Sequence, residues 1–188
     1  MKTLIINGSP RKNGDTQTLI NEFKKHISGE VIVVSAYHDK ISACTDCRAC
    51  WKKQGCTIDD DMSKVYADDY DVFVIASPVY MFNLTGPLMS LASRFQMYYS
   101  AKRFLDNPIA RRKKSAVLLL VAGGDGGAWP AIESAKLIFK IMNAAYDETN
   151  TVLSLKTDEL PAKDDVKALG KAREAALRMN ELWSADTL

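Results

Sequence analysis

The sequence lacks the features that would assign it to a membrane, to nucleic acid or to an oxidising compartment. Its 25 Lys and Arg nearly balance its 23 Asp and Glu, and a formal net charge of +2 implies neither a nucleic-acid nor a membrane partner. No apolar run approaches the length of a membrane span, and the opening MKTLII is too short for a signal peptide. We therefore expect a cytoplasmic protein with no nucleic-acid and no membrane partner.

Histidine and cysteine are also scarce. Only two histidines are present, and neither is placed with a serine or a cysteine in a way that suggests a nucleophile with its base. All four cysteines lie between residues 44 and 56. In a reducing compartment these cysteines are not expected to form structural disulfides.

Two common glycine-rich phosphate motifs are missing from the first turn of the chain. Five residues separate Gly8 from Gly14 and Asp15 follows, which does not match the nucleoside-triphosphate loop, and the dinucleotide fingerprint is absent. What is present is an apolar run at 4–6, a polar turn, and then an amphipathic helical pattern that includes Leu19. A strand, a turn and a helix N-terminus in this order favour binding of a phosphate monoester, although an ordinary turn is the alternative.

Strand and helix patterns alternate along the whole chain. Strands are predicted at 4–6, 30–36, 71–76, 115–122 and 149–155, and helices from about 15 to 27 and at 60–69, 87–99, 129–146 and 164–183, with a polar connection at 100–114. Such alternation indicates an α/β fold, a doubly wound five-stranded parallel sheet in the order 2-1-3-4-5 with helices on both faces. We expect one domain over residues 1–188, with a cysteine-rich loop at 41–61.

Three loops carry the unusual residues, and all three are expected at the carboxyl edge of the sheet. These loops are 8–16, 77–86 and 122–128. Ligands of doubly wound sheets bind at this edge, where the strand order reverses. Pro78 stiffens the second loop and Tyr80 offers an aromatic ring, while the run GGDGG lets bare backbone approach a ligand in the third.

The strings GSPRKNGDT and SPVY resemble the phosphate and ring loops of the flavodoxin-like NAD(P)H-dependent FMN reductase and iron–sulfur flavoprotein family. The resemblance implies FMN, with the phosphate held by one group of residues, the isoalloxazine lined by a second, and the pyrimidine side approached by a third. The three groups are Ser9, Arg11, Gly14, Thr16, Gln17 and Thr18; Pro78, Val79, Tyr80 and Met81; and Gly123, Gly124 and Asp125.

Two positions depart from the family pattern. Asp15 stands where the family loop usually has Asn, and a carboxylate near a phosphate is repulsive unless it points away. Ser93 precedes Arg94 where many relatives have an Asp-Arg pair, so an ion pair often found there is expected to be missing.

The basic run 111–114 lies before the fourth strand, and we predict a solvated basic face there.

The cysteines Cys44, Cys47, Cys50 and Cys56 follow the spacing C-x2-C-x2-C-x5-C. Four thiolates on a short loop can ligate a [4Fe–4S] cluster, and the spacing resembles that of the iron–sulfur flavoproteins. Free thiols or a redox pair are the main alternative. Zinc is a weaker one, because structural zinc sites usually pair two knuckles across a longer gap.

The resemblance implies an oxidoreductase that passes electrons from NAD(P)H through FMN to a small acceptor such as a flavin or a quinone, with an iron–sulfur cluster as a candidate relay. The flavin carries this chemistry, so no catalytic acid or base side chain is predicted. The alternative is a non-catalytic, flavodoxin- or ferredoxin-like electron carrier that serves a partner protein. The resemblance also implies a homodimer or a homotetramer.

Overall fold

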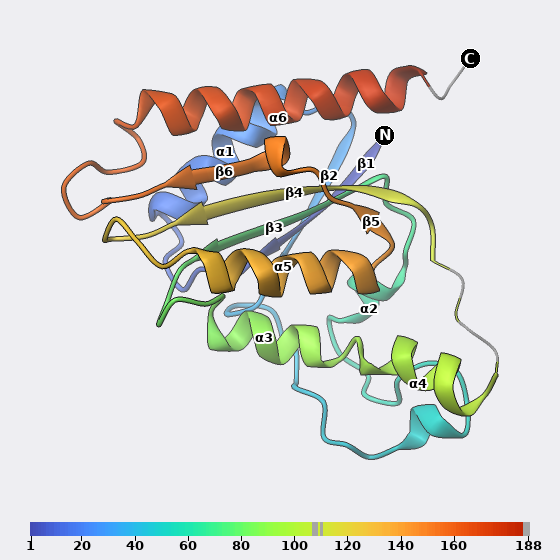
Figure 1. The fold of residues 1–188 in the computed structure, drawn as a ribbon. Coiled ribbons are helices and arrows are strands. Elements are labelled where there is room, and N and C mark those ends of the chain that lie inside the picture. Colours follow the sequence, from blue (N-terminus) through green and yellow to red (C-terminus); the bar gives the residue numbers. More distant parts are fainter. Residues whose placement is uncertain (107–108, 110, 186–188) are drawn as a thin grey trace.

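A parallel sheet forms the centre of the computed structural model, which describes residues 1–106, 109 and 111–185 (Figure 1). The strands run in the order β2-β1-β3-β4, and both β5 and β6 pair with β4. The bounds are β1 Lys2–Asn7, β2 Glu30–Ser35, β3 Val72–Pro78, β4 Lys114–Val121, β5 Ala144–Ala145 and β6 Thr151–Ser154. The order 2-1-3-4-5 is confirmed with β6 as the predicted fifth strand, and β5 is an additional short strand on the same side of β4.

Helices cover both faces of the sheet (Figure 1). On one face lie α1 and α6, which pack their apolar residues together with Ile5. The other face is covered by α2, α3, α4 and α5, around a second core that includes Leu4 and Ile6. The bounds are α1 Asp15–His26, α2 Ser63–Tyr66, α3 Gly86–Ser93, α4 Gln96–Phe104, α5 Trp129–Ile141 and α6 Val166–Ala185, with short 3-10 turns at Ala49–Trp51 and Glu148–Asn150.

The central strands are buried on both sides, which is why they read as continuous apolar runs rather than alternating ones. Every residue of β3 is buried. Successive residues of β1 point into different cores, Leu4 and Ile6 into one and Ile5 into the other. The doubly wound fold therefore follows directly from the sequence pattern.

The predicted helix at 87–99 is wrong in its extent, because the structure divides it into α3 and α4. The backbone N–H of Arg94 bonds to Leu91 and that of Phe95 bonds to Ala92, which is a tight turn of 3-10 type between the two helices. The second helix then continues to Phe104, into the expected connection 100–114. Residues 107, 108 and 110 of that connection lie outside the described residues.

Two other predicted helices are too long. The segment 129–146 leaves the helix after Ile141, because Asn143 takes a left-handed conformation (φ 55°) and 144–145 join the sheet edge as β5. The segment 60–69 contains only the single turn of α2. Asp68, with φ 51°, turns the chain towards β3.

The basic run before β4 is a solvated face only in part, because Arg112 and Lys113 are exposed but Lys114 is buried. The side chain of Lys114 is fully buried, forms an ion pair with Asp68 at 2.5 Å, and donates hydrogen bonds to the carbonyls of Arg112 and Met142. Arg112 forms an ion pair with Asp71. Burial lowers the pKa of Lys114, and Asp68 opposes that shift. Part of the run thus fastens the amino ends of β3 and β4.

None of the helices in the described ranges is long and apolar enough to cross a lipid bilayer.

Candidate functional site

A cavity of about 230 Å³ opens at the carboxyl edge of the sheet, the left side of Figure 1. The strands end side by side there, since Asn7 pairs with Ala76 and Val121 pairs with both Pro78 and Ser154. The loops that leave this edge supply the lining residues: Ser9, Arg11, Asp15 and Thr16; Pro78, Val79 and Tyr80; Val121, Ala122 and Gly123; and Thr157 and Asp158.

The first loop forms a tight polar turn above β1. The backbone N–H of Ser9 donates to the side chain of Asn7 at 2.9 Å, and the N–H of Arg11 donates to Oγ of Ser9 at 3.2 Å. Ser9 is buried, whereas the Arg11 side chain is exposed at the cavity. This turn places a hydroxyl inside the cavity and an exposed cation at its rim.

The helix α1 starts at the cavity with an uncapped end. Its N-cap is Gly14, which has no side chain to bond the N–H groups of the first turn, and Thr16 lies buried beside them. Such an end carries a partial positive charge and suits an anion. The Thr18 hydroxyl donates to the carbonyl of Gly14 at 3.4 Å within the helix. The Gln17 side chain donates to Asn21 at 2.8 Å and accepts from the Asn7 side chain of β1 at 3.3 Å.

Asp15 lines the cavity but is also fastened to another loop. Its Oδ1 accepts the backbone N–H of Ala162 at 2.8 Å, across 147 residues of sequence. The carboxylate therefore joins the start of α1 to the segment that follows β6. This bond explains an acidic residue next to an anion site, although it leaves the negative charge in place.

The second loop contains an unusual turn. Tyr80 and Asn83 exchange backbone hydrogen bonds at 2.9 and 3.0 Å, and the two residues between them, Met81 and Phe82, both have positive φ, 48° and 66°. Two left-handed central residues define a turn of type I′, which normally takes Asn or Gly. Large side chains in this conformation are strained, and such strain often marks a functional loop.

The third loop meets the second at a glycine. A Cβ built on Gly127 would lie 2.1 Å from Cδ1 of Phe82, and Gly127 itself has φ +82°. The absence of a side chain there lets the Phe82 ring pack directly on the backbone. The loops after β3 and β4 are thus held against each other on one side of the cavity (Figure 1).

A further loop, after β6, completes the cavity, and the sequence analysis missed it. Thr157 donates its backbone N–H to the carbonyl of Ala122. The Asp158 carboxylate packs so close to Gly123 that a Cβ built on this glycine would lie 2.5 Å from Oδ2 of Asp158. The signal was available: TDEL follows the fifth strand, whose carboxyl end must lie beside that of its neighbour β4.

The cavity brings together about half of the residues predicted from the sequence and leaves the others outside its lining. Ser9, Arg11, Thr16, Pro78, Val79, Tyr80 and Gly123 line it, whereas Gly14, Gln17, Thr18, Met81, Gly124 and Asp125 do not. The carbonyl of Gly124 accepts the N–H of Lys156, and Asp125 is exposed beside the same lysine. Met81 is 89% exposed at the tip of its turn.

The cysteines form a second site. Cys44, Cys47, Cys50 and Cys56 all line one small cavity of about 30 Å³, together with Arg94. Cys44 and Cys47 are exposed and the other two are half-buried. A hydrogen bond from the backbone N–H of Ala49, helped by the hydroxyl of Thr57, lowers the pKa of Cys47. Within the described ranges, no three His, Cys, Asp or Glu side chains converge on a single metal-ion position.

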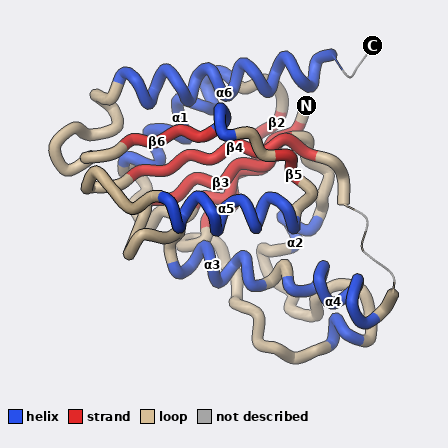
Figure 2. The backbone as a smooth tube through the Cα atoms, viewed as in Figure 1, coloured by secondary structure: helices blue, strands red, loops and turns tan. Residues whose placement is uncertain are grey.

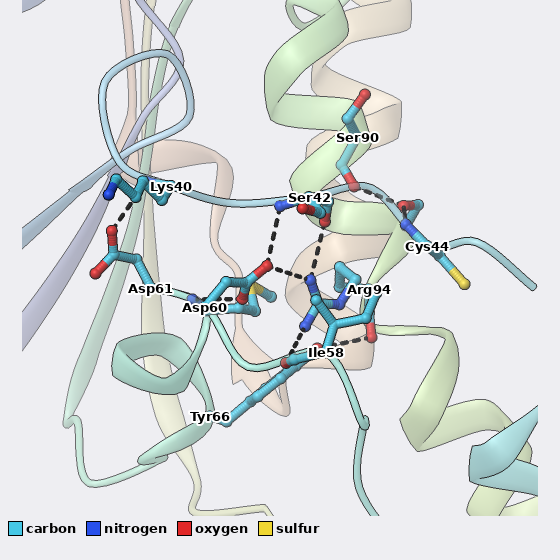
Figure 3. A network of polar contacts seen from close by, with 11 residues as sticks. Lys40, Ser42, Cys44, Ile58, Asp60, Asp61, Tyr66, Ser90 and Arg94 are labelled. Carbon is cyan, nitrogen blue, oxygen red and sulfur yellow. Dashed lines mark hydrogen bonds and ion pairs between the residues drawn. The ribbon is translucent and has the colours of Figure 1, made fainter. Parts of the chain in front are cut away.

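The base of this cysteine loop is held by one buried arginine (Figure 3). Arg94 donates to the carbonyls of Ser42 at 2.9 Å and Ile58 at 3.1 Å, and to the Asp60 carboxylate at 2.7 Å. Ser93 supplies no carboxylate for the ion pair that was expected to be missing, and Arg94 pairs with Asp60 instead. Burial opposes ionisation of Asp60, but the hydrogen bond from Arg94 and those from backbone N–H groups outweigh it and lower its pKa. Ser93 accepts the backbone N–H of Cys44 at 2.9 Å.

The edge cavity lies near the start of α3 and the cysteine pocket lies at its end. Figure 2 traces the course of this helix. At its start, the Thr85 hydroxyl donates to the carbonyl of Gly8, and at its end Ser93 and Arg94 hold the cysteine loop. The helix has 8 residues, which is about 12 Å of rise. One short helix thus connects the two sites.

A doubly wound parallel sheet with a polar turn and a helix N-terminus after β1, and with further loops after β3 and β4 at the same edge, is the flavodoxin-like architecture. The family model for NADPH-dependent FMN reductases matches residues 1–159. The chain belongs to this family, and it is accordingly an NAD(P)H-dependent oxidoreductase.

Curated relatives are iron–sulfur flavoproteins of archaea. That of Methanosarcina thermophila is 32% identical over 140 residues, covering 71% of this chain and 70% of the relative. One from Methanocaldococcus jannaschii is 34% identical over 133 residues, covering 68% and 64%. One from Archaeoglobus fulgidus is 32% identical over 103 residues, covering 52% and 47%. The chain thus spans from about half to 70% of the length of these relatives.

Solved structures of similar fold have low sequence identity. An NAD(P)H:quinone oxidoreductase from Methanothermobacter marburgensis superposes with a TM-score of 0.69 at 14% identity, covering 96% of this chain and 97% of the other. An FMN-dependent NADH-azoreductase from Bacillus anthracis, in complex with FMN, gives 0.61 at 19%, covering 95% and 99%. These likenesses establish the flavodoxin-like fold.

Proposed function

We propose that the protein takes electrons from NAD(P)H onto FMN in the edge cavity and passes them to a small acceptor such as a flavin or a quinone, with a [4Fe–4S] cluster in the cysteine pocket as relay. The observation that carries the proposal is the gathering of Ser9, Arg11, Thr16 and the 78–80 loop around one cavity at the sheet edge. FMN supplies the exchange between a hydride and electrons when it is bound.

The residues of the cavity fit FMN in two parts. The Ser9 and Thr16 hydroxyls and the uncapped start of α1 would hold the phosphate, and Arg11 adds a positive charge at the rim. Pro78, Val79 and Tyr80 would line the ring system. Tyr80 is 45% exposed, which leaves the rim accessible to a nicotinamide and then to an acceptor.

The cysteine pocket fits a cluster in its donor set. A [4Fe–4S] cluster takes each thiolate on a different iron and supplies a one-electron store when it is bound. A single zinc ion needs its four ligands around one point. Thiols spread around a pocket, as here, suit the cluster better. The cavity has room for about two water molecules, so the exposed loop must open to admit the cluster.

The test is a visible spectrum with iron and sulfide analysis of protein purified without air, followed by NADH and NADPH oxidation with a flavin or a quinone. Flavin bands over a broad iron–sulfur shoulder, and turnover with an acceptor, support the proposal. Flavin bands without iron or sulfide refute the relay. Holoprotein inert to both nucleotides but reducible chemically refutes the enzyme and favours the electron carrier.

Matched variants localise each site. Arg11→Gln should weaken FMN binding by about 1 kcal/mol, or roughly fivefold in Kd, whereas Lys12→Gln removes a neighbouring cation that does not line the cavity. Cys56→Ser should lower the iron content, and Thr45→Ser, a change at the same pocket without a thiol, should not. Equal effects of the paired variants would contradict the assignment.

A further inference from the structure

Arg94 occupies an unusual position for an arginine. Its side chain has 0% exposure, yet it bonds to three different parts of the chain, the carbonyls of Ser42 and Ile58 and the carboxylate of Asp60. Its own carbonyl accepts the hydroxyl of Tyr66 at 3.1 Å. Burying a guanidinium is costly unless it is fully paired, and in the described residues its Nε is buried without a hydrogen-bond partner.

The carbonyls that Arg94 holds stand at the two ends of the cysteine loop. Ser42 precedes Cys44 and Ile58 follows Cys56, so a single planar group closes the loop at its neck (Figure 3). Closing a loop costs chain entropy, and a fixed fork of donors can supply that closure in one geometry. The thiols are thereby kept around one pocket.

The second feature of Arg94 is its place in the lining of the cysteine pocket. Arg94 is among the residues that line the pocket, whereas its partner Asp60 is not. The side chain of Arg48, the other arginine in the lining, is 59% exposed and pairs with Asp46. A buried charge is screened far less than an exposed one, so we expect Arg94 to act on the thiols more strongly than Arg48, while the Asp60 carboxylate offsets part of its charge.

We propose that Arg94 is the positioning residue of the cysteine pocket: it closes the neck of the loop around the four thiols, and its charge raises the reduction potential of the cluster. The effect of the charge on the cluster rests on the proposed function, whereas the closing of the loop does not. Cluster potentials follow net charge and hydrogen bonding around the sulfurs, and a nearby positive charge favours the reduced, more negative state.

The experiment compares wild type, Arg94→Lys, Arg94→Gln and Arg48→Gln by two measurements. The first is the alkylation rate of each thiol in cluster-free protein, read by mass spectrometry. The second is the midpoint potential of the reconstituted cluster, from a redox titration followed by electron paramagnetic resonance. FMN affinity, which depends on the far end of α3, reports whether each variant is folded; if Arg94→Gln does not fold, Arg94→Lys carries the test of the neck.

The role in closing the loop predicts a change in alkylation rates, and the role of the charge predicts a change in midpoint potential. Both Arg94 variants should speed alkylation of the half-buried Cys50 and Cys56 about tenfold, because they lose hydrogen bonds from a charged donor, and Arg48→Gln should not. The potential should fall in Arg94→Gln, stay near wild type in Arg94→Lys, and fall less in Arg48→Gln.

Each contrary result has one meaning. Wild-type alkylation rates in folded Arg94→Lys and Arg94→Gln would overturn the role in closing the neck. An unchanged potential in Arg94→Gln, or an equal fall in Arg48→Gln, would overturn the role of the charge. A wild-type protein that takes up no cluster would refute the relay of the proposed function and the charge role with it, while the alkylation rates would still decide the neck.

Discussion

The contact between Phe82 and Gly127 gives the sharpest test of how the edge cavity is built. Gly127→Ala adds a methyl group where the structure leaves 2.1 Å to Cδ1 of Phe82, at a position with φ +82°. No carbon can occupy that space, so the Phe82 ring must move, and we expect the turn that carries it, next to Tyr80 of the cavity, to shift with it.

The magnitude follows from two terms. A left-handed conformation costs an alanine about 1 kcal/mol relative to glycine. Displacing a packed ring costs about 1–3 kcal/mol in a core, and the low end applies because Phe82 is 61% exposed. We expect a loss of about 2 kcal/mol in unfolding free energy, which lowers Tm by roughly 4–8 °C at this size. FMN should bind about tenfold more weakly if the displaced turn costs about 1.4 kcal/mol of binding.

The assays are thermal unfolding and quenching of flavin fluorescence on binding. Gly126→Ala is the matched control, because a Cβ there meets nothing within 4 Å and Gly126 has no positive φ. Adding Phe82→Ala to Gly127→Ala should recover the part of the lost unfolding free energy that comes from the clash with the ring, but not the part that comes from the left-handed backbone. If Gly127→Ala is as stable as Gly126→Ala and binds FMN equally well, the two loops do not depend on this contact.

Three further outcomes are expected. Asp15→Asn should tighten FMN binding by about 1 kcal/mol, because Asn still accepts the N–H of Ala162 while the repulsion is lost; an unchanged Kd at low salt would show that the carboxylate does not act on the ligand. Since the pKa of Asp60 is lowered in the folded protein, its pairing with Arg94 stabilises the fold above about pH 4 and this stability is lost as the pH falls through the folded pKa. Asp60→Asn should therefore cost about 3 kcal/mol near pH 7 and flatten the acid limb of a stability-against-pH curve; parallel limbs in both proteins would count against it. The homodimer or homotetramer stays a prediction, and light scattering that gives the mass of one chain would end it.

The sheet and the polar turn after β1 could be predicted because local rules decide them. Buried strands read as apolar runs, and turn-forming residues before an amphipathic pattern mark the start of a helix. The type I′ turn at 80–83 could not, since Met81 and Phe82 have no preference for positive φ and only contact with Gly127 explains the turn. The sequence does not show that the loop of Gly127 packs on this turn, nor that this packing offsets the backbone strain at Met81 and Phe82.

The closing of the cysteine loop also depends on contacts that the local sequence pattern does not show. The spacing of the thiols predicted ligation of one cluster, which stays a prediction, and the structure shows the four thiols in the lining of one pocket. The neck depends on Arg94 and Asp60, 34 residues apart. The break between α3 and α4, which places that arginine, has no proline or glycine to announce it. Tertiary pairing overrode a continuous helical pattern there.

The position of β1 between β2 and β3 has a consequence for how the chain is made. Synthesis delivers Leu4 to Ile6 first, but one edge of that strand finds its partner only when residues 72–78 have left the ribosome. Until then an apolar edge is open to pairing with other chains. Truncations that end before β3 should therefore collect as aggregates rather than as smaller folded units.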